Sequence, residues 1–213
     1  MRSYHLTSLP LSFLLRMKMN LIFIALTILI LFPTSAFCET WTGNINLLFG
    51  QKELEKDDWE PLEEQTEIGI ALDFKEKSWP VSFAVEFLHS QDDENESFNI
   101  PGVGTVRAKL DGSTTEFAVG LRWIIEANSV VNFFISGGLA YINAELEIDI
   151  DDYSDSEDDS AFGYWCGAGL YFTLAKHFNV GAQVRYSDAE VEIYDIDGEA
   201  GGTHLLLFAG YHW

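Results

Sequence analysis

The feature that most constrains the fold of this chain is an alternation of apolar and polar residues that recurs along its length. Successive side chains of a β-strand point to opposite faces, so a period of two indicates strands. In the last segment, residues 203–213, one face carries Leu205, Leu207, Tyr211 and Trp213. Earlier segments alternate in the same way, at residues 41–51, 66–75, 81–89, 115–126, 130–148, 161–174 and 178–194. The sequence therefore predicts an all-β protein of eight strands.

The connections between these segments also follow a pattern. Every second connection is short, at residues 76–80, 127–129 and 175–177. The others are long or acidic, at residues 52–65, 91–114, 149–160 and 195–202. Within them we expect residues 105–110 to extend the fourth strand. Short turns at one rim and long loops at the other are typical of outer-membrane barrels, in which the short turns face the periplasm.

The N-terminal residues have the layout of a secretory signal peptide. Arg16 and Lys18 precede an apolar run at residues 21–32, and small residues lead up to Cys38. The run is too short to span a bilayer as a helix, which favours a cleaved export signal. We therefore predict a signal peptide at residues 1–38.

Cleavage at this point leaves a barrel domain at residues 39–213, and residues 1–16 are a candidate superfluous extension. Bulky Phe37 disfavours the alternative in which Cys38 is a lipid-anchored cysteine. Cys166 is then the only cysteine of the barrel domain, so we expect no internal disulfide.

The charge of the barrel domain excludes one large class of function. It holds all 34 acidic residues of the chain but only nine of the 12 basic ones, a formal charge of −25. Nucleic-acid binding needs lysines and arginines to neutralise phosphates, so we expect no nucleic-acid partner.

The two faces of the predicted strands distinguish a membrane barrel from a soluble one. One face is almost entirely Val, Leu, Ile, Phe, Tyr and Trp, and the other carries Gly, Ala, Asn, Gln and charged residues. An eight-stranded barrel has an interior only just wide enough for side chains, so the bulky face fits better against lipid. A soluble lipocalin-like ligand-binding barrel remains the alternative. Aromatic residues fall near the predicted strand ends, as interfacial girdles require: Trp41, Trp79, Trp123, Tyr141, Tyr164 and Trp213.

Taken together, the export signal, the loop asymmetry and the terminal aromatic make the barrel domain resemble small bacterial outer-membrane barrels of the OmpA transmembrane-domain or OmpX type. The resemblance implies an eight-stranded antiparallel up-and-down transmembrane β-barrel with long acidic extracellular loops, in the outer membrane of a Gram-negative bacterium. It implies lipopolysaccharide and the barrel-assembly machinery as partners, a monomer, and no cofactor. The assembly signal would be the apolar face of the last strand: Leu205, Leu207, Tyr211 and Trp213.

Charged residues on the predicted inward faces are the first candidate site. They are Asp73, Glu86, Arg122 and Arg185, with Glu67 and Glu116 nearer the outer end. A charge in a narrow lumen must be paired or hydrated. The set is interpreted as an ion network that fills the lumen, and the alternative is a gate or an ion path.

An acidic stretch is a second candidate, for a calcium site. Asp151, Asp152, Asp155 and Glu157 supply oxygen ligands of the kind that Ca²⁺ prefers. The stretch lacks the spaced glycine and terminal glutamate of an EF-hand loop. A solvated acidic surface is therefore the interpretation, and cation-bridged contact with lipopolysaccharide is the alternative.

A lipid-modifying enzyme is the third candidate, because some small outer-membrane barrels use serine, histidine and a carboxylate. His204 with Ser90 or Ser187 and Glu190 would be such a set, although no spacing supports it. We expect a non-enzymatic barrel with a structural, adhesive or protective role. A narrow, mostly closed pore for small solutes or ions is the nearest alternative.

Overall fold

The computed structural model describes residues 40–55, 59, 61–100, 104–150, 153–193 and 196–213. The predicted signal peptide and Cys38 lie outside the described residues. Over the described part the chain forms ten strands: β1 (Trp41–Glu53), β2 (Glu64–Glu76), β3 (Ser82–Ile100), β4 (Gly104–Glu126), β5 (Val131–Ile150), β6 (Tyr153–Leu174), β7 (Phe178–Asp188), β8 (Glu190–Ile193), β9 (Ile196–Glu199) and β10 (Gly202–His212). No helix among these residues is long and apolar enough to cross a membrane.

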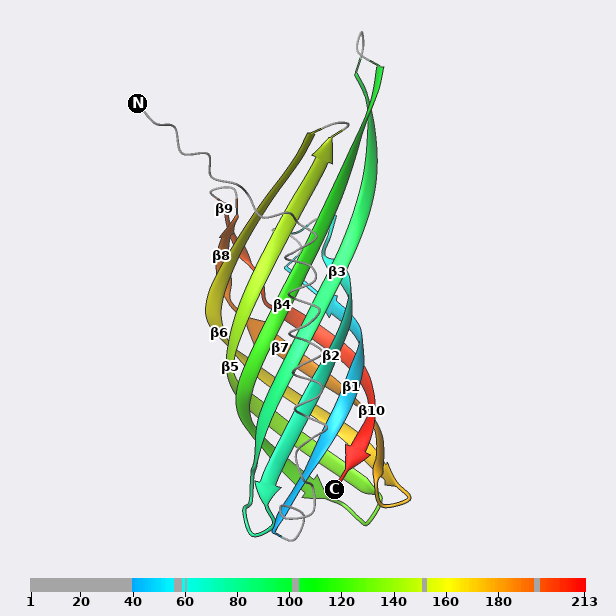
Figure 1. Ribbon diagram of the computed structural model, residues 1–213, viewed down its shortest axis with the longest axis vertical. Helices are drawn as coiled ribbons and strands as arrows, with labels where there is room; N and C mark the ends of the chain where they lie inside the picture. The colour runs from blue at the N-terminus through cyan, green and yellow to red at the C-terminus, as the bar shows by residue number, and fades with distance from the viewer. Residues whose placement is uncertain (1–39, 56–58, 60, 101–103, 151–152, 194–195) are drawn as a thin grey trace, which may run out of the picture. The chain divides into compact units, whose positions relative to one another are not determined.

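Eight of the strands close into an antiparallel barrel in the order β1-β10-β7-β6-β5-β4-β3-β2, and β8 and β9 form a separate hairpin (Figure 1). The closure joins the first strand to the last, with Asn44 opposite His212. One residue further, the backbone N–H of Trp213 donates to the Gly43 carbonyl at 3.1 Å. The eight strands therefore close into the antiparallel barrel that the sequence predicts, and the predicted fold class is confirmed.

The alternation seen in the sequence separates the inside of the barrel from the outside. On β10, Leu205 and Leu207 are exposed on the outer surface, whereas His204, Leu206 and Phe208 are buried inside. The same division holds on the other barrel strands, where the outward faces are apolar. Aromatic side chains gather at the short-turn rim, where the Trp41 and Trp79 rings lie 5.5 Å apart. The outside of the barrel is therefore an apolar surface suited to lipid.

The strands β3 and β6 run further than the sequence predicts, whereas β5 ends within two residues of the predicted 130–148. Residues 91–114 and 149–160 were expected to be mostly loop, but β3 and β4 stay paired up to Ile100 opposite Gly104, and β5 and β6 up to Ile150 opposite Tyr153. The predicted extension of the fourth strand at residues 105–110 is confirmed. Figure 1 shows the four strands rising beyond the rest of the barrel. Residues 91–100 and 153–160 are mostly polar and do not alternate, so their pairing was not predicted, whereas residues 145–150 alternate strictly.

The predicted seventh strand, residues 178–194, is also wrong at its end. β7 stops at Asp188, and the chain turns into the β8–β9 hairpin before returning as β10. Ala189, Val191 and Ile193 are buried, so the hairpin turns one side toward the interior. The acidic residues that were expected in a loop therefore belong to a short folded element.

Candidate functional site

The first candidate site is a network of charges inside the barrel. Arg122 on β4 makes two ion pairs, with Asp73 at 3.1 Å and with Glu86 at 2.6 Å. Its guanidinium also lies 4.3 Å from the centre of the Phe134 ring, a cation–π contact. All three charged side chains are almost fully buried. Because buried charges without partners are costly, this pairing is what allows them to remain in the lumen.

Glu86 joins this group to a second one nearer the outer end. Its other oxygen lies 3.1 Å from Nε of Arg185, close enough for an ion pair although not aligned as a hydrogen bond. Arg185 also pairs with Glu116 and lies over the Trp165 ring, 4.9 Å from its centre. The four residues singled out from the sequence, Asp73, Glu86, Arg122 and Arg185, thus meet in one connected network with Glu116.

His204 extends the network toward β2. Its Nδ1 lies 2.9 Å from both oxygens of Glu67, and its Nε2 lies 3.2 Å from a guanidinium nitrogen of Arg185. Arginine only donates, so Nε2 accepts and the ring proton sits on Nδ1, which donates to Glu67. The histidine therefore links Arg185 to Glu67 by hydrogen bonds at its two ring nitrogens.

The triad considered from the sequence is realised only in part. The Ser187 hydroxyl lies 2.9 Å from Nε2 of His204, but the carboxylate on the far side of the ring is Glu67 and not Glu190, which is exposed on β8. Ser90 lies elsewhere and bonds to Gln65 and Thr114. The Ser187 hydroxyl is fully buried and is also within 3.1 Å of Glu116. A serine enclosed in this way has no open side from which a lipid carbonyl can approach.

Lys52 is the main lumen residue that the sequence reading missed, because it was assigned to a loop. It continues the inward parity of Asn44, Asn46 and Leu48 on β1 and is 1% exposed. Its ammonium donates to the Thr114 hydroxyl at 2.9 Å and to the Ala200 carbonyl at 2.8 Å. Following the alternation two residues further would have placed it inside.

Apolar side chains fill the rest of the lumen. One buried cluster, here called the apolar lumen cluster, consists of Leu48, Ala71, Leu88, Phe134, Tyr171, Leu206 and Phe208. The rings of Phe134, Tyr171 and Phe208 lie within 6.2 to 6.3 Å of one another. Together with the ion network, this cluster occupies the middle of the barrel with side chains.

A second apolar group covers the outer end. This outer cap brings residues of the first connection and of the β8–β9 segment onto the barrel wall: Leu54, Trp59, Ala189, Val191, Ile193 and Ala200. The Trp59 indole N–H donates to the Glu199 carbonyl at 2.7 Å, which ties the two connections together. The cap packs on Ile142, Ala144 and Trp165 of the wall.

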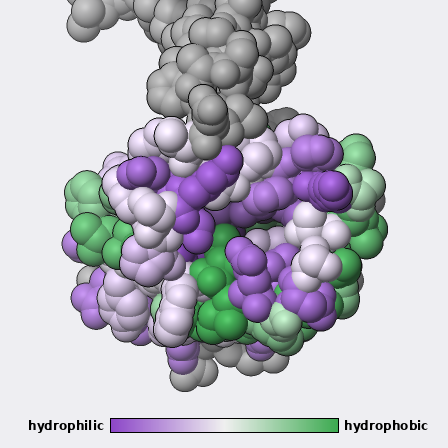
Figure 2. Space-filling model, turned by 90° about the horizontal axis from the view of Figure 1, so that it is seen from below, coloured by the Kyte–Doolittle hydropathy of each residue, from purple (hydrophilic) through white to green (hydrophobic). Residues whose placement is uncertain are grey.

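The opposite end of the lumen is open and polar. A cavity of about 250 Å³ lies there, bordered by Asn44, Asp73, Lys75, Glu126, Tyr171 and His212 among others. Hydrophilic residues ring this mouth when the barrel is viewed from below (Figure 2). We call this cavity the periplasmic vestibule, because it lies at the short-turn rim.

The calcium candidates are only partly described. Asp155 and Glu157 lie on β6 in the protruding sheet, and Asp151 and Asp152 fall outside the described residues. Within the described part, no group of three or more His, Cys, Asp or Glu side chains is arranged to hold a metal ion. Nearby, the Lys109 ammonium pairs with Asp111 at 2.6 Å, and this bond raises the pKa of the lysine.

The residues of the predicted assembly signal lie on the outer surface of the closing strand. Leu205, Leu207 and Tyr211 are exposed there, and the backbone of Trp213 bonds to Gly43. A Cβ atom at Gly43 would meet the Trp213 ring at 2.6 Å, so glycine leaves the space that this ring occupies. The residues predicted to form the assembly signal therefore lie on the strand that closes the barrel.

A closed barrel with an apolar belt and a side-chain-filled lumen defines a small transmembrane β-barrel protein. The sequence matches the family described as "Outer membrane protein beta-barrel domain" over residues 24–213, so the chain belongs to this family, whose members lie in the bacterial outer membrane. A search of curated proteins found no match.

Solved structures of outer-membrane proteins share the fold. Ail, the attachment invasion locus protein of Yersinia pestis, solved with the heparin analogue sucrose octasulfate, is 18% identical, with a TM-score of 0.55 over 82% of this chain and 99% of that chain. A major outer membrane protein of Thermus thermophilus is 9% identical, with a TM-score of 0.52 over 81% and 99%. Neisserial surface protein A is 10% identical, with a TM-score of 0.50 over 81% and 97%. At these identities the likeness shows the fold alone.

Proposed function

We propose that this protein is a non-conducting, non-enzymatic outer-membrane protein that acts through its protruding sheet, by binding an extended basic polypeptide. The observation that carries the proposal is the contrast between a lumen filled with paired charges and apolar side chains and a four-stranded sheet that rises beyond the barrel. A filled lumen offers no path for solutes, and an exposed sheet offers a surface for a partner.

The edge of β3 is the part of the sheet that best fits a partner strand. β2 pairs with β3 only up to Gln91, and no strand among the described residues pairs with β3 on that side from Asp92 to Ile100. Unpaired backbone N–H and C=O groups of an edge strand accept an added strand. The other edge differs, because Asp159 of β6 accepts a hydrogen bond from the backbone of Glu192 on β8.

The charge of this edge supports a basic partner. Its sequence contains Asp92, Asp93, Glu94 and Glu96, and the barrel domain as a whole carries a formal charge of −25. Opposite charge steers association, so this acidic edge favours a cationic partner. A polyanion such as the heparin analogue solved with Ail is disfavoured here, because acidic groups would repel it.

The remaining parts of the proposal concern the membrane itself. Lipopolysaccharide is the expected neighbour of the apolar flank, and the barrel-assembly machinery is the expected partner of Leu205, Leu207, Tyr211 and Trp213.

The non-enzymatic part of the proposal is supported by the enclosure of Ser187, whose neighbours His204 and Glu116 are themselves bonded to Arg185. A serine-reactive fluorophosphonate that labels Ser187 in the folded barrel would contradict it.

Binding to synthetic peptides tests the surface function. The full chain in lipid nanodiscs is titrated with an alternating Lys/Val peptide, with the same peptide N-methylated at alternate residues, and with an alternating Glu/Val peptide. We expect saturable binding of the first peptide that weakens as salt rises. The N-methylated peptide keeps its charge but cannot add to the sheet, so we expect about tenfold weaker binding. Equal binding of the two basic peptides would refute strand addition.

A further inference from the structure

The periplasmic vestibule carries an arrangement of charges that the lumen network does not use. Its floor is internally satisfied, since Asp73 accepts hydrogen bonds from Asn44 at 2.8 Å and from Arg122 at 3.1 Å. The carbonyl oxygen of Asn44 in turn accepts from Asn179 at 2.7 Å and from Nδ1 of His212 at 2.9 Å. These side chains form a hydrogen-bonded base beneath the open part of the cavity.

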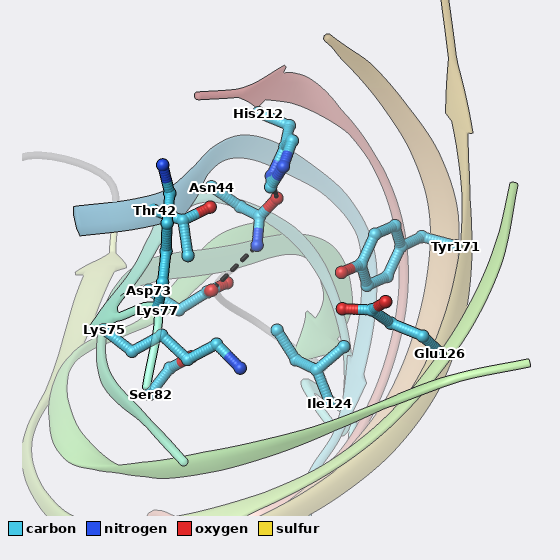
Figure 3. Close-up of a pocket in the computed structure, with 11 residues that line it drawn as sticks. Thr42, Asn44, Asp73, Lys75, Lys77, Ser82, Ile124, Glu126, Tyr171 and His212 are labelled. Carbon is cyan, nitrogen blue, oxygen red and sulfur yellow. Dashed lines mark hydrogen bonds between the residues drawn. The ribbon is translucent and has the colours of Figure 1, made fainter. Parts of the chain in front are cut away.

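The walls of the vestibule differ from its floor. Lys75 lies on one side and Glu126 on the other, and Lys77 also lines the cavity. Neither Lys75 nor Glu126 makes a salt bridge with any residue that the structure describes. Figure 3 shows the Lys75 ammonium reaching toward the middle of the cavity, and the Glu126 carboxylate beside Tyr171 on the facing wall. Ile124 lies between the two walls and adds an apolar surface.

We propose that the periplasmic vestibule binds a small zwitterion of the α-amino-acid class. Its carboxylate would meet Lys75, its ammonium would meet Glu126, and a short apolar side chain would rest on Ile124. A simple anion would gain the first contact but face the carboxylate of Glu126, and a simple cation would gain the second but face Lys75. Only a ligand with both charges satisfies both walls.

The size of the vestibule fits such a ligand. A volume of about 250 Å³ lies just below the roughly 300 Å³ at which pockets for drug-sized molecules begin. It corresponds to about eight waters at roughly 30 Å³ each, which one small amino acid displaces in part. The site opens at the opposite end of the barrel from the protruding sheet, so this inference does not depend on the function proposed for that sheet.

Calorimetric or NMR titration of the full chain in nanodiscs tests the proposal with four probes: L-alanine, glycine, propionate and ethylamine. Propionate is alanine without its ammonium group, and ethylamine is alanine without its carboxylate. We expect saturable binding of alanine and glycine, and binding of propionate and of ethylamine that is at least tenfold weaker. The imidazole resonances of His212 are expected to shift on saturation, because this ring lines the cavity.

Two substitutions test the two walls of the vestibule one at a time. Both residues lie at strand ends, where the packing of the barrel does not depend on their side chains. Lys75→Met is expected to weaken alanine about tenfold but to strengthen ethylamine, which no longer faces the ammonium. Glu126→Gln is expected to weaken alanine about tenfold but to strengthen propionate, which no longer faces the carboxylate. Lys176→Met, in the exposed turn between β6 and β7, is the matched control and should change nothing. Retention of the folded barrel is checked by its resistance to heat in a gel.

Three results would overturn the proposal. The first is no saturable binding of alanine, which would leave a hydrated mouth only. The second is propionate binding as tightly as alanine, which would indicate a simple anion site. The third is alanine affinity that neither Lys75→Met nor Glu126→Gln alters.

Discussion

The lumen and the protruding sheet use charge in opposite ways, although both are built from β3 and β4. In the lumen, Arg122 and Arg185 each contact buried carboxylates. In the sheet, the Lys109–Asp111 pair is partly exposed to water, and many acidic residues surround it. Pairing is obligatory where water is excluded and optional where it is not. The same strands therefore contribute rigidity at one end and a solvated, acidic surface at the other.

The largest expected effect is the loss of a lumen arginine. Arg185→Ala leaves Glu86 and Glu116 buried with one partner fewer, which costs about 3–5 kcal/mol when a buried ion pair is broken. Urea unfolding from lipid vesicles measures the change. Lys109→Ala in the protruding sheet is the control and should leave the unfolding midpoint where it was. Equal unfolding midpoints for Arg185→Ala and the wild type would contradict the claim that the lumen charges must be paired.

A slightly smaller effect is expected in the apolar lumen cluster. Phe134→Ala removes a buried ring that packs against Tyr171 and Phe208, and a cavity of this kind costs about 3 kcal/mol. Phe134→Leu keeps a large apolar side chain at the same buried position and is the matched control. The same urea assay should separate the two variants. If both lost the same stability, the lumen would not be a packed core.

Shortening the protruding sheet should have little effect on the barrel. Replacing residues 94–110 by an Asn-Gly turn keeps the register from Ser82 opposite Arg122 up to Asp93 opposite Asp111. We expect an unchanged unfolding midpoint together with loss of binding to the basic peptide. A large fall in stability would mean that the sheet supports the barrel.

The smallest effect concerns the contact between the sheet and the β8–β9 hairpin. The Asp159 carboxylate accepts backbone hydrogen bonds from Glu192 and Ser160, which lower its pKa. A pKa lowered in the folded state means that the contact is stabilising above the ordinary pKa and is lost as pH falls through the folded value. The amide resonance of Glu192 should therefore hold its position at neutral pH and move in acid. Asp159→Asn should place it near its acid position at every pH.

The sequence predicts the barrel well because two environments act on it at once. Lipid on one side and a narrow lumen on the other force every membrane strand to alternate, and this is how Asp73, Glu86, Arg122 and Arg185 were found. The extensions of β3 and β6 escaped prediction because residues 91–100 and 153–160 are mostly polar and do not alternate. The β8–β9 hairpin escaped because Glu190–Ile193 also alternates and was therefore interpreted as the end of the seventh strand.

The pairings inside the lumen cannot be predicted from the alternation of the sequence. Alternation shows that Glu67 and His204 point inward, but their contact joins residues 137 positions apart and depends on how the sheet closes. The same holds for Ser187, whose neighbours follow from register. Lys52 was the exception, since its parity on β1 was readable and only the predicted strand end was misplaced.

Electrical conductance of the wild-type protein in a planar lipid bilayer tests the central claim, a closed lumen, most directly. The ion network and the apolar lumen cluster predict no current above the bilayer baseline, and Arg122→Ala is expected to produce current because it removes the link between Asp73 and Glu86. Steady single-channel current from the wild type would contradict this account and favour a pore.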